Sequence, residues 1–190
     1  MSGGLHVFWI TSRAAGSVAL LLASASVVCG LMIGSRFTSN RADFRAVHEG
    51  LSLATLGFVA LHGLALLGDS WLNPGISGIA IPFAGSYRPV WTGLGIIAGY
   101  GLAILGLTYY LRDRIGANRW RRLHRLTAVF WLLAIGHTLG AGTDATQDWF
   151  LLLAGAFVLP AALLLATRWM GRAAAPAPDA GAAGAKPLSG

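Results

Sequence analysis

The sequence predicts an all-α polytopic membrane protein, a helical bundle with about five transmembrane helices. Of its 190 residues, 55% are hydrophobic and only 11% are charged, whereas about a quarter of the residues in a soluble domain are charged. The charges gather in short clusters between long apolar stretches, and about 18 or more apolar residues in a row are typical of a membrane span. The stretches lack the alternation of barrel strands, so they are predicted to be helices.

Five apolar stretches are long enough to cross the bilayer, each with about 19–22 residues at a rise of about 1.5 Å per residue. They cover residues 14–34, 47–68, 91–111, 123–141 and 149–167. The longest connection, residues 69–90, is expected to fold back over one face of the bundle. Residues 1–170 are therefore predicted to form one membrane domain, and the Ala/Pro/Gly-rich residues 171–190 a disordered cytoplasmic tail.

Arginines predict the orientation of this bundle, because cytoplasmic segments carry an excess of Lys and Arg. With five spans, three arginine-rich groups lie on the same side: Arg36, Arg41 and Arg45; Arg112, Arg114, Arg119, Arg121, Arg122 and Arg125; and Arg168 and Arg172. This side, called the inner end below, is predicted to be cytoplasmic, with the N-terminus outside and the C-terminus inside the plasma (inner) membrane. The net charge of +7 then reflects insertion and lipid headgroups, and no nucleic-acid partner is expected.

Four of the five histidines lie in two of the predicted spans, where ionisable groups are costly. His48 and His62 belong to the second span with the spacing H-x13-H, and His124 and His137 to the fourth with H-x12-H. Such intervals rise about 20–21 Å along a helix, so each span carries one histidine near each membrane face. Both spans run from inside to outside, and we therefore expect His48 to face His124 and His62 to face His137.

Two histidines at each of two levels favour iron with two axial imidazoles over zinc, which needs four ligands within a few Å. Two six-coordinate b-type haems, stacked about 20 Å apart, fit between the two spans. Double axial ligation leaves no open iron position, which predicts electron transfer and not oxygen binding. Two alternatives remain: a chain that binds a single haem, and a haem-free scaffold or assembly subunit whose histidines only brace the bundle.

Helical phase agrees with this arrangement in the second span but not in the fourth. Fourteen residues return to within about 40° of the starting face, whereas thirteen residues miss it by about 140°. The fourth helix is therefore expected to bend, with Gly136 as the candidate weak point, or else His124 approaches its iron from a helix end.

These features resemble the ferric reductase-like transmembrane domain superfamily. It includes ferric reductases, the membrane part of NADPH oxidases and the haem-binding membrane subunit of the bacterial methionine sulfoxide reductase system. The resemblance covers about residues 9–167. It rests on the histidine spacings, on W-R-R-L-H-R-L at residues 120–126, and on P-F…Y-R-P…W-T at residues 82–92. It implies an electron-transfer subunit with two b haems on the four histidines. Family members commonly have six spans, however, and the oxidases and iron reductases append FAD and NAD(P)H domains.

No FAD or NAD(P) site is expected in this sequence. The glycines at residues 93–101 lie within a predicted span, so they form no dinucleotide fingerprint, and Gly95 and Gly99 are expected to permit close helix packing. The electron donor is therefore expected to be a cytoplasmic flavin reductase or a membrane quinol. The acceptor is expected to be an extracytoplasmic reductase, which the resemblance favours, or a ferric chelate. Whether the chain is itself an enzyme stays open.

Haem propionates are anionic and need cations near each membrane face. Arg125, beside His124, is the expected inner partner. Further candidates are Arg41, Arg45, Arg121 and Arg122, although membrane topology and lipid contact explain most of these arginines without a haem. At the outer end, Arg88 is expected to face either the outer haem or an incoming substrate.

Overall fold

The computed structural model describes residues 3–34 and 40–173, and helices make up most of that part. The elements are α1 (Gly3–Ile33), α2 (Arg41–Leu67), α3 (Gly75–Ala80), α4 (Pro89–Leu107), the 3-10 helix η1 (Thr108–Leu111), α5 (Arg112–Ile115), α6 (Ala117–His124), α7 (Thr127–Ala141) and α8 (Asp148–Ala173). The described residues contain no strand, which confirms the prediction of an all-α bundle. Most of the predicted tail, from residue 174 on, lies outside the described residues.

Four of the described helices are long and apolar enough to cross a membrane. They are α1, α2, α4 with its continuation through η1 and α5, and α8. Helix α7 has only 15 residues, fewer than the roughly 20 that a full crossing needs. Helix α6 extends the same segment beyond a break. The predicted span over residues 123–141 is therefore divided by a break and is not among these four helices, while the polytopic helical bundle itself is confirmed.

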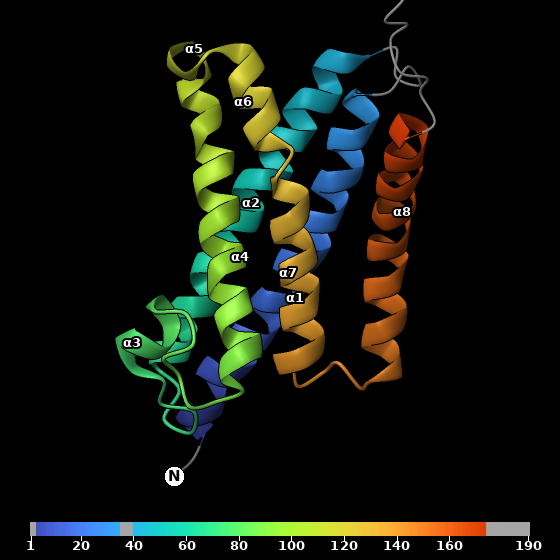
Figure 1. Ribbon diagram of the computed structural model, residues 1–190. Coiled ribbons are helices and arrows are strands. Elements are labelled where there is room, and N and C mark those ends of the chain that lie inside the picture. The colour runs from blue at the N-terminus through green and yellow to red at the C-terminus, as the bar shows by residue number, and fades with distance from the viewer. Residues whose placement is uncertain (1–2, 35–39, 174–190) are drawn as a thin grey trace, which may run out of the picture.

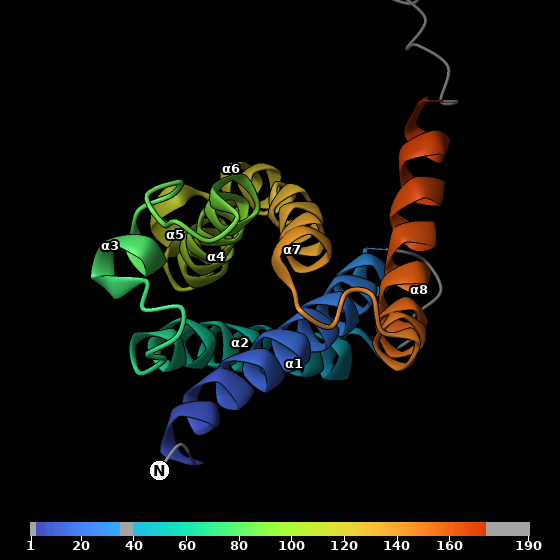
Figure 2. The same ribbon diagram turned by 90° about the horizontal axis from the view of Figure 1, so that it is seen from below.

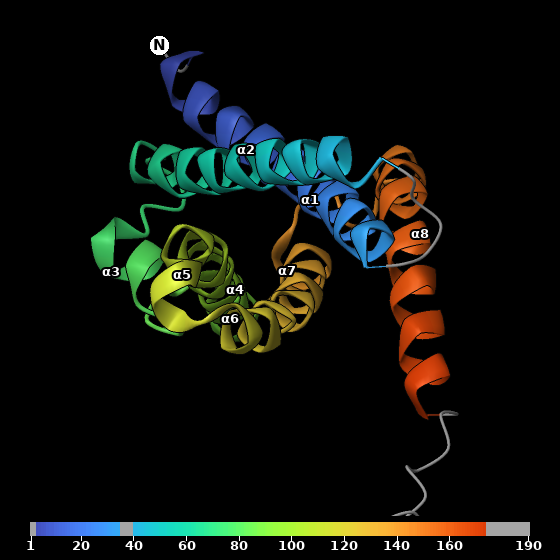
Figure 3. The same cartoon turned by 90° about the horizontal axis from the view of Figure 1, so that it is seen from above.

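The long helices form two facing layers. Helices α1 and α2 pack against each other along their length, α4 and α7 do the same, and α8 lies beside α1. Figure 1 shows both pairs as antiparallel, and Figures 2 and 3 show the two layers from below and from above. The N-terminus and the last residues of α8 lie at opposite ends of the bundle (Figure 1), as five crossings require. The end that faces the cytoplasm stays a prediction.

The most completely buried of the described side chains lie where α1, α7 and α8 meet. Trp131 of α7 is 0% exposed, and its Nε1 donates a hydrogen bond to Ser24 Oγ of α1 at 3.1 Å. Ala23 of α1 and Ala161 of α8 belong to the same buried cluster. A tryptophan in the middle of a span, away from the membrane interfaces, is thus a core residue whose N–H is satisfied.

A salt bridge connects the first helix with the connection between α7 and α8. Arg13 Nε donates to Asp144 Oδ2 at 3.1 Å, and a second guanidinium nitrogen binds the other carboxylate oxygen. The Arg13 guanidinium also lies 4.1 Å above the Trp9 ring. The pair ties α1 to the connection between α7 and α8 at the outer end of the bundle.

The predicted long connection, residues 69–90, contains the short helix α3 and packs at the outer ends of other helices. The Tyr100 hydroxyl of α4 donates to the Ala80 carbonyl at 2.7 Å, and the Tyr87 hydroxyl donates to the Ala141 carbonyl at 3.2 Å. The connection therefore joins the outer ends of α4 and α7 on one side of the bundle.

Candidate functional site between the helix layers

Helix α2 carries the first two histidines on one side. It is continuous from residue 41 to residue 67, so His48 and His62 are separated by four turns less about 40°, a rise of about 21 Å. Both side chains are half-buried. One lies toward the inner end and the other toward the outer end, as the spacing predicted.

Helix α1 holds both of these rings through serine residues. His48 Nδ1 lies 2.9 Å from the Ser26 carbonyl and 3.0 Å from the Ser26 hydroxyl. In the same way, His62 Nδ1 lies 2.8 Å from the Ser12 carbonyl and 2.9 Å from the Ser12 hydroxyl. Each ring is therefore oriented by the main chain and a side chain of one residue.

A glycine one turn after each serine leaves room for the ring. A Cβ atom at Gly16 would lie 3.0 Å from the His62 ring, and one at Gly30 would lie 3.1 Å from the His48 ring. The Ser-x3-Gly pairs at residues 12–16 and 26–30 thus repeat with the same 14-residue interval as the two histidines. This repeat is not among the predictions made from the sequence, although its 14-residue interval is a signal that points to it.

The other two histidines lie on either side of a helix break. His124 is the last residue of α6, and His137 lies within α7. Because Arg125 and Leu126 form a turn between the helices, the phase of a single helix no longer applies to the thirteen-residue interval. The break lies at Arg125 and Leu126 and not at the expected weak point Gly136, which lies inside α7. The alternative expectation, a histidine at a helix end, agrees with the structure.

Helix α4 holds His137 in the way that α1 holds the α2 histidines. His137 Nδ1 lies 2.9 Å from the Trp91 carbonyl. A Cβ atom at Gly95 would overlap the His137 ring, whereas one at Gly99 would lie 3.4 Å from Val59. Gly95 therefore makes room for a histidine ring, which is more specific than the general helix packing that we expected.

His124 is held differently. Its Nδ1 is buried and has no hydrogen-bond partner of good geometry among the described residues, although the Leu105 backbone lies close enough to interact with the ring. Its ring stacks on Trp120 instead, with centroids 4.9 Å apart and planes at 25°. An aromatic contact thus adds to a weak backbone contact at His124, whereas a backbone carbonyl at hydrogen-bond distance orients each of the other three rings.

The structure brings the four histidines together as the two predicted pairs. The ring centroids of His48 and His124 lie 6.0 Å apart, and those of His62 and His137 lie 6.2 Å apart. Two imidazoles on opposite sides of one metal ion, each with a metal–nitrogen bond of about 2.0 Å, place their centroids about 6.3 Å apart. Both pairs therefore have the spacing of two axial ligands on one ion.

Hydrogen bonding also selects the tautomer that a metal requires. A backbone carbonyl can only accept a hydrogen bond, so His48, His62 and His137 carry a proton on Nδ1 and keep the Nε2 lone pair free. Metal-ligating histidines typically donate their other N–H in this way. Within the described residues, no three His, Cys, Asp or Glu side chains gather as a metal site. The residues present therefore fit iron with two axial imidazoles better than a four-ligand zinc site.

Arg125, the expected inner propionate partner, and Arg88, expected to face the outer haem or an incoming substrate, lie near the inner and the outer pair. Arg125 occupies the break after α6 and is exposed. Arg88 precedes α4 with a φ of 42°, and its Nη1 donates to the Gly140 carbonyl near the end of α7 at 2.6 Å. A cation near a helix C-terminus is favourable, so Arg88 has a structural role there. A role in cofactor binding stays a prediction for both residues.

A row of aromatic side chains, which our sequence reasoning did not single out, lies beside the inner pair. Tyr110, Tyr109 and Trp120 follow one another with ring centroids 5.3 Å and 5.7 Å apart, and Trp120 ends the row on His124. The Tyr110 hydroxyl donates to Glu49 Oε1 of α2 at 2.8 Å. The row therefore connects η1 with both α2 and α6.

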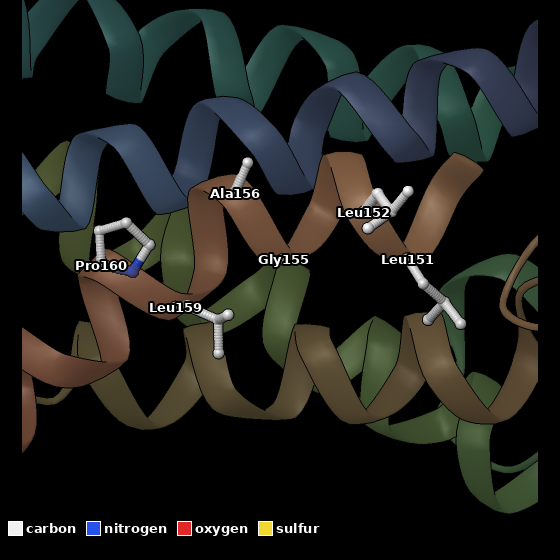
Figure 4. Close-up of a pocket in the computed structure, with 6 residues that line it drawn as sticks. All are labelled: Leu151, Leu152, Gly155, Ala156, Leu159 and Pro160. Atoms are coloured by element: carbon white, nitrogen blue, oxygen red, sulfur yellow. The ribbon is translucent and has the colours of Figure 1, made fainter. Parts of the chain in front are cut away.

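Shallow grooves occur at two places on the described surface. One lies at the outer end, next to the carbonyl that orients His137, and is lined by Arg88, Pro89, Val90, Trp91 and Gly140. Another runs along the exposed apolar face of α8 and is lined by Leu151, Leu152, Gly155, Ala156, Leu159 and Pro160 (Figure 4). The α8 groove contains no polar side chain, so only the outer groove adjoins a histidine pair.

Fold and site together define a class of protein, a membrane helical bundle with one opposed histidine pair toward each end. Residues 15–135 match the family model described as "Ferric reductase like transmembrane component". The match covers more than half of the chain, and the chain therefore belongs to this family, which confirms the resemblance stated above. It includes His48, His62 and His124 and ends two residues before His137. No curated protein and no solved structure matches the chain.

Proposed function

We propose that this chain is a transmembrane b-type dihaem electron-transfer protein of the plasma (inner) membrane. Membership in the ferric reductase-like family indicates a membrane electron-transfer role. The observation that supports the two haems is the pair of centroid distances, 6.0 Å and 6.2 Å, which suits two imidazoles on one iron. The direction of transfer in this proposal is from the inner end to the outer end.

Each histidine has a defined task in the proposal. His48 and His124 would hold the inner haem, and His62 and His137 would hold the outer haem, each through Nε2. A bound haem would supply a one-electron Fe(III)/Fe(II) couple. The carbonyls and glycines of α1 and α4 keep the proton on Nδ1 and fix the direction of the Nε2 lone pair. With two histidines at each site, a bound iron would have no position open to oxygen or to a substrate.

The separation of the pairs supports a conduit. Two sites about 21 Å apart along α2 lie toward opposite faces of a hydrocarbon layer about 30 Å thick. The proposed donor at the inner end is a cytoplasmic flavin reductase or a membrane quinol. The proposed acceptor at the outer end is an extracytoplasmic reductase or a ferric chelate. The outer groove offers the exposed Arg88 beside Trp91 for docking of such an acceptor.

Haem content and redox titration of the purified full-length protein test the proposal. Protein made with an adequate haem supply should contain about two b-type haems per chain and titrate in two steps. A variant with leucine at all four histidine positions serves as the empty control. One haem per chain would favour the single-haem alternative, and a protein without haem would refute the proposal in favour of a scaffold or assembly subunit.

A His62→Leu substitution tests the pairing. It should remove the outer haem and stop transfer across the membrane while the inner haem stays, so that the haem content falls by about half. Leu61→Ala is the matched control, because Leu61 neighbours His62 on α2 but is 43% exposed on another side of the helix. If the His62→Leu protein retains both haems, the assignment of ligands is wrong.

A further inference from the structure

The two histidine pairs differ at one of their four rings. His48, His62 and His137 each meet a backbone carbonyl at Nδ1, at 2.9 Å, 2.8 Å and 2.9 Å. His124 has no such hydrogen bond of good geometry among the described residues and stands at the last position of α6, next to the break. The Leu105 backbone lies close to this ring but makes no hydrogen bond of good geometry with it, so a further contact contributes to the plane of the ring.

Trp120 supplies that contact. It precedes His124 by four residues on α6, so the two side chains are neighbours on the helix surface. Their rings stack with centroids 4.9 Å apart and planes at 25°, within the range of favourable aromatic pairs. Tyr109 packs against the Trp120 ring with centroids 5.7 Å apart, and the Arg112 guanidinium lies 4.3 Å from the Tyr109 ring. The orientation of His124 therefore depends on η1 and α5 as well as on α6.

The indole nitrogen of Trp120 adds an independent observation. Trp120 Nε1 is buried and has no hydrogen-bond partner among the described residues, whereas Trp131 Nε1 donates to Ser24. Buried indole N–H groups usually have an acceptor, and each one that lacks a partner calls for an explanation. A haem carries anionic carboxylates, which are the kind of acceptor that this N–H lacks.

We propose that Trp120 is the positioning residue of the inner site, where its ring sets the plane of His124 and its N–H binds a carboxylate of the inner haem. This inference rests on the proposed function. The outer site has no counterpart, because the residue four positions before His137 is the aliphatic Leu133. Changes at Trp120 should therefore act on one site and leave the other as it is.

Two substitutions in the full-length, haem-loaded protein separate the ring from its N–H. Trp120→Phe keeps an aromatic ring and removes the N–H. It should preserve both haems and both low-spin EPR signals but shift one step of the redox titration to lower potential, because an unpaired carboxylate stabilises ferric iron. Trp120→Leu removes the ring and should also alter one of the two EPR signals and reduce haem retention at that site.

Two further variants make the assignment specific. Trp131→Phe is the matched control, since it also removes a buried N–H but from a ring that packs between α1 and α8. It should leave the EPR signals and both titration steps unchanged. His62→Leu identifies the inner signal, because it should retain the inner haem alone.

The outcomes separate the two proposals. If both Trp120 variants keep the EPR signals and titration steps of the unsubstituted protein, the positioning role is wrong although haem is bound. Equal changes at both sites, or the same changes in Trp131→Phe, also overturn it, because they report a general loss of packing. If the Trp120→Leu protein does not accumulate, the redox titration of the Trp120→Phe protein decides alone whether Trp120 acts on the inner site. An unsubstituted protein without haem refutes the proposed function itself.

Discussion

Three of the four histidines owe their orientation to a backbone carbonyl and a glycine, and not to other charged groups. A helical carbonyl oxygen has two lone pairs, so the carbonyls of Ser12 and Ser26 can accept from histidine as well as from their own helix. Gly16 and Gly30 remove the Cβ atoms that would crowd the rings. At the scale of single residues, small side chains on α1 and α4 therefore help to set the orientation of the histidine rings.

A Gly95→Ala substitution should damage the outer pair. The added Cβ would overlap the His137 ring, so the ring has to move away from the Trp91 carbonyl and from His62. We expect a loss of about half of the bound haem, measured as haem per chain. Gly99→Ala is the control, since its Cβ would lie 3.4 Å from Val59 and should leave the haem content unchanged. Full haem content in Gly95→Ala would contradict this explanation of the glycine.

Serine substitutions on α1 should tune the two sites one at a time. Ser12→Ala and Ser26→Ala remove a hydroxyl that lies 2.9 Å and 3.0 Å from a histidine Nδ1 but keep the accepting carbonyl. Haem binding should persist. One titration step should shift by at most about 1 kcal/mol, or roughly 40 mV for a one-electron couple. Ser24→Ala, on the same helix but bonded to Trp131, should shift neither step. A shift of both steps by either variant would show that the serines act on the whole bundle.

At the scale of elements, the break between α6 and α7 decides whether one segment can serve both sites. Leu126 N donates to the Leu123 carbonyl at 2.9 Å, an i to i+3 turn, and Thr127 Oγ1 donates to the His124 carbonyl at 2.7 Å. Such a tighter turn changes the rotation between two helices. Neither proline nor glycine stands at residues 124–127, so the sequence around the break contains no strong helix-breaking signal.

Inserting one alanine between Arg125 and Leu126 tests the importance of this turn. One extra residue rotates α7 by about 100° relative to α6, which turns His137 away from His62 or displaces His124 from His48. We expect the loss of at least one haem, read from the absorption spectrum. A single alanine inserted between Ala145 and Thr146, in the connection before α8, should leave both haems. Equal haem content in both insertion variants would show that the register across the break is unimportant.

At the scale of the whole molecule, two antiparallel helix pairs face each other and present histidines from opposite layers at two depths. Helices α1 and α4 lie behind the histidines of α2 and α7 and hold their rings, while α8 packs against α1 on the other side. The arrangement gives each site a ligand from each layer. A change in the distance between the layers should therefore affect both sites together, whereas the local substitutions above affect one.

The predicted sidedness can be tested by labelling. In a Cys29→Ala background, which removes the single cysteine, we introduce Ser70→Cys at the outer end or Arg119→Cys at the inner end; both positions are exposed. A membrane-impermeant maleimide should label the first in intact cells and the second only after permeabilisation, because the arginine-rich end is predicted to be cytoplasmic. The reverse labelling pattern would invert the proposed direction of electron transfer.

Much of the architecture of this molecule follows from two properties of each segment of the sequence, its apolar length and its helical rise. Apolar length and helical rise predicted the spans and placed His48 level with His124 and His62 level with His137, and the structure has these pairs. The same arithmetic predicted a mismatch of phase in the fourth span. This arithmetic could not locate the break. The turn after His124 depends on tertiary contacts, which override the helix propensity of the local sequence.

The sequence by itself therefore determined an all-α membrane bundle and the pairing of its histidines, since hydrophobic length and periodicity are properties of each segment alone. Only the tertiary structure decided how the rings are held. Ser12 meets His62 across fifty residues, and Trp91 meets His137 across forty-six, so these contacts exist only once the helices have packed. The physical reason is that a carbonyl, a glycine or an indole orients a histidine only when the fold places it beside the ring. The residue type alone does not specify that position.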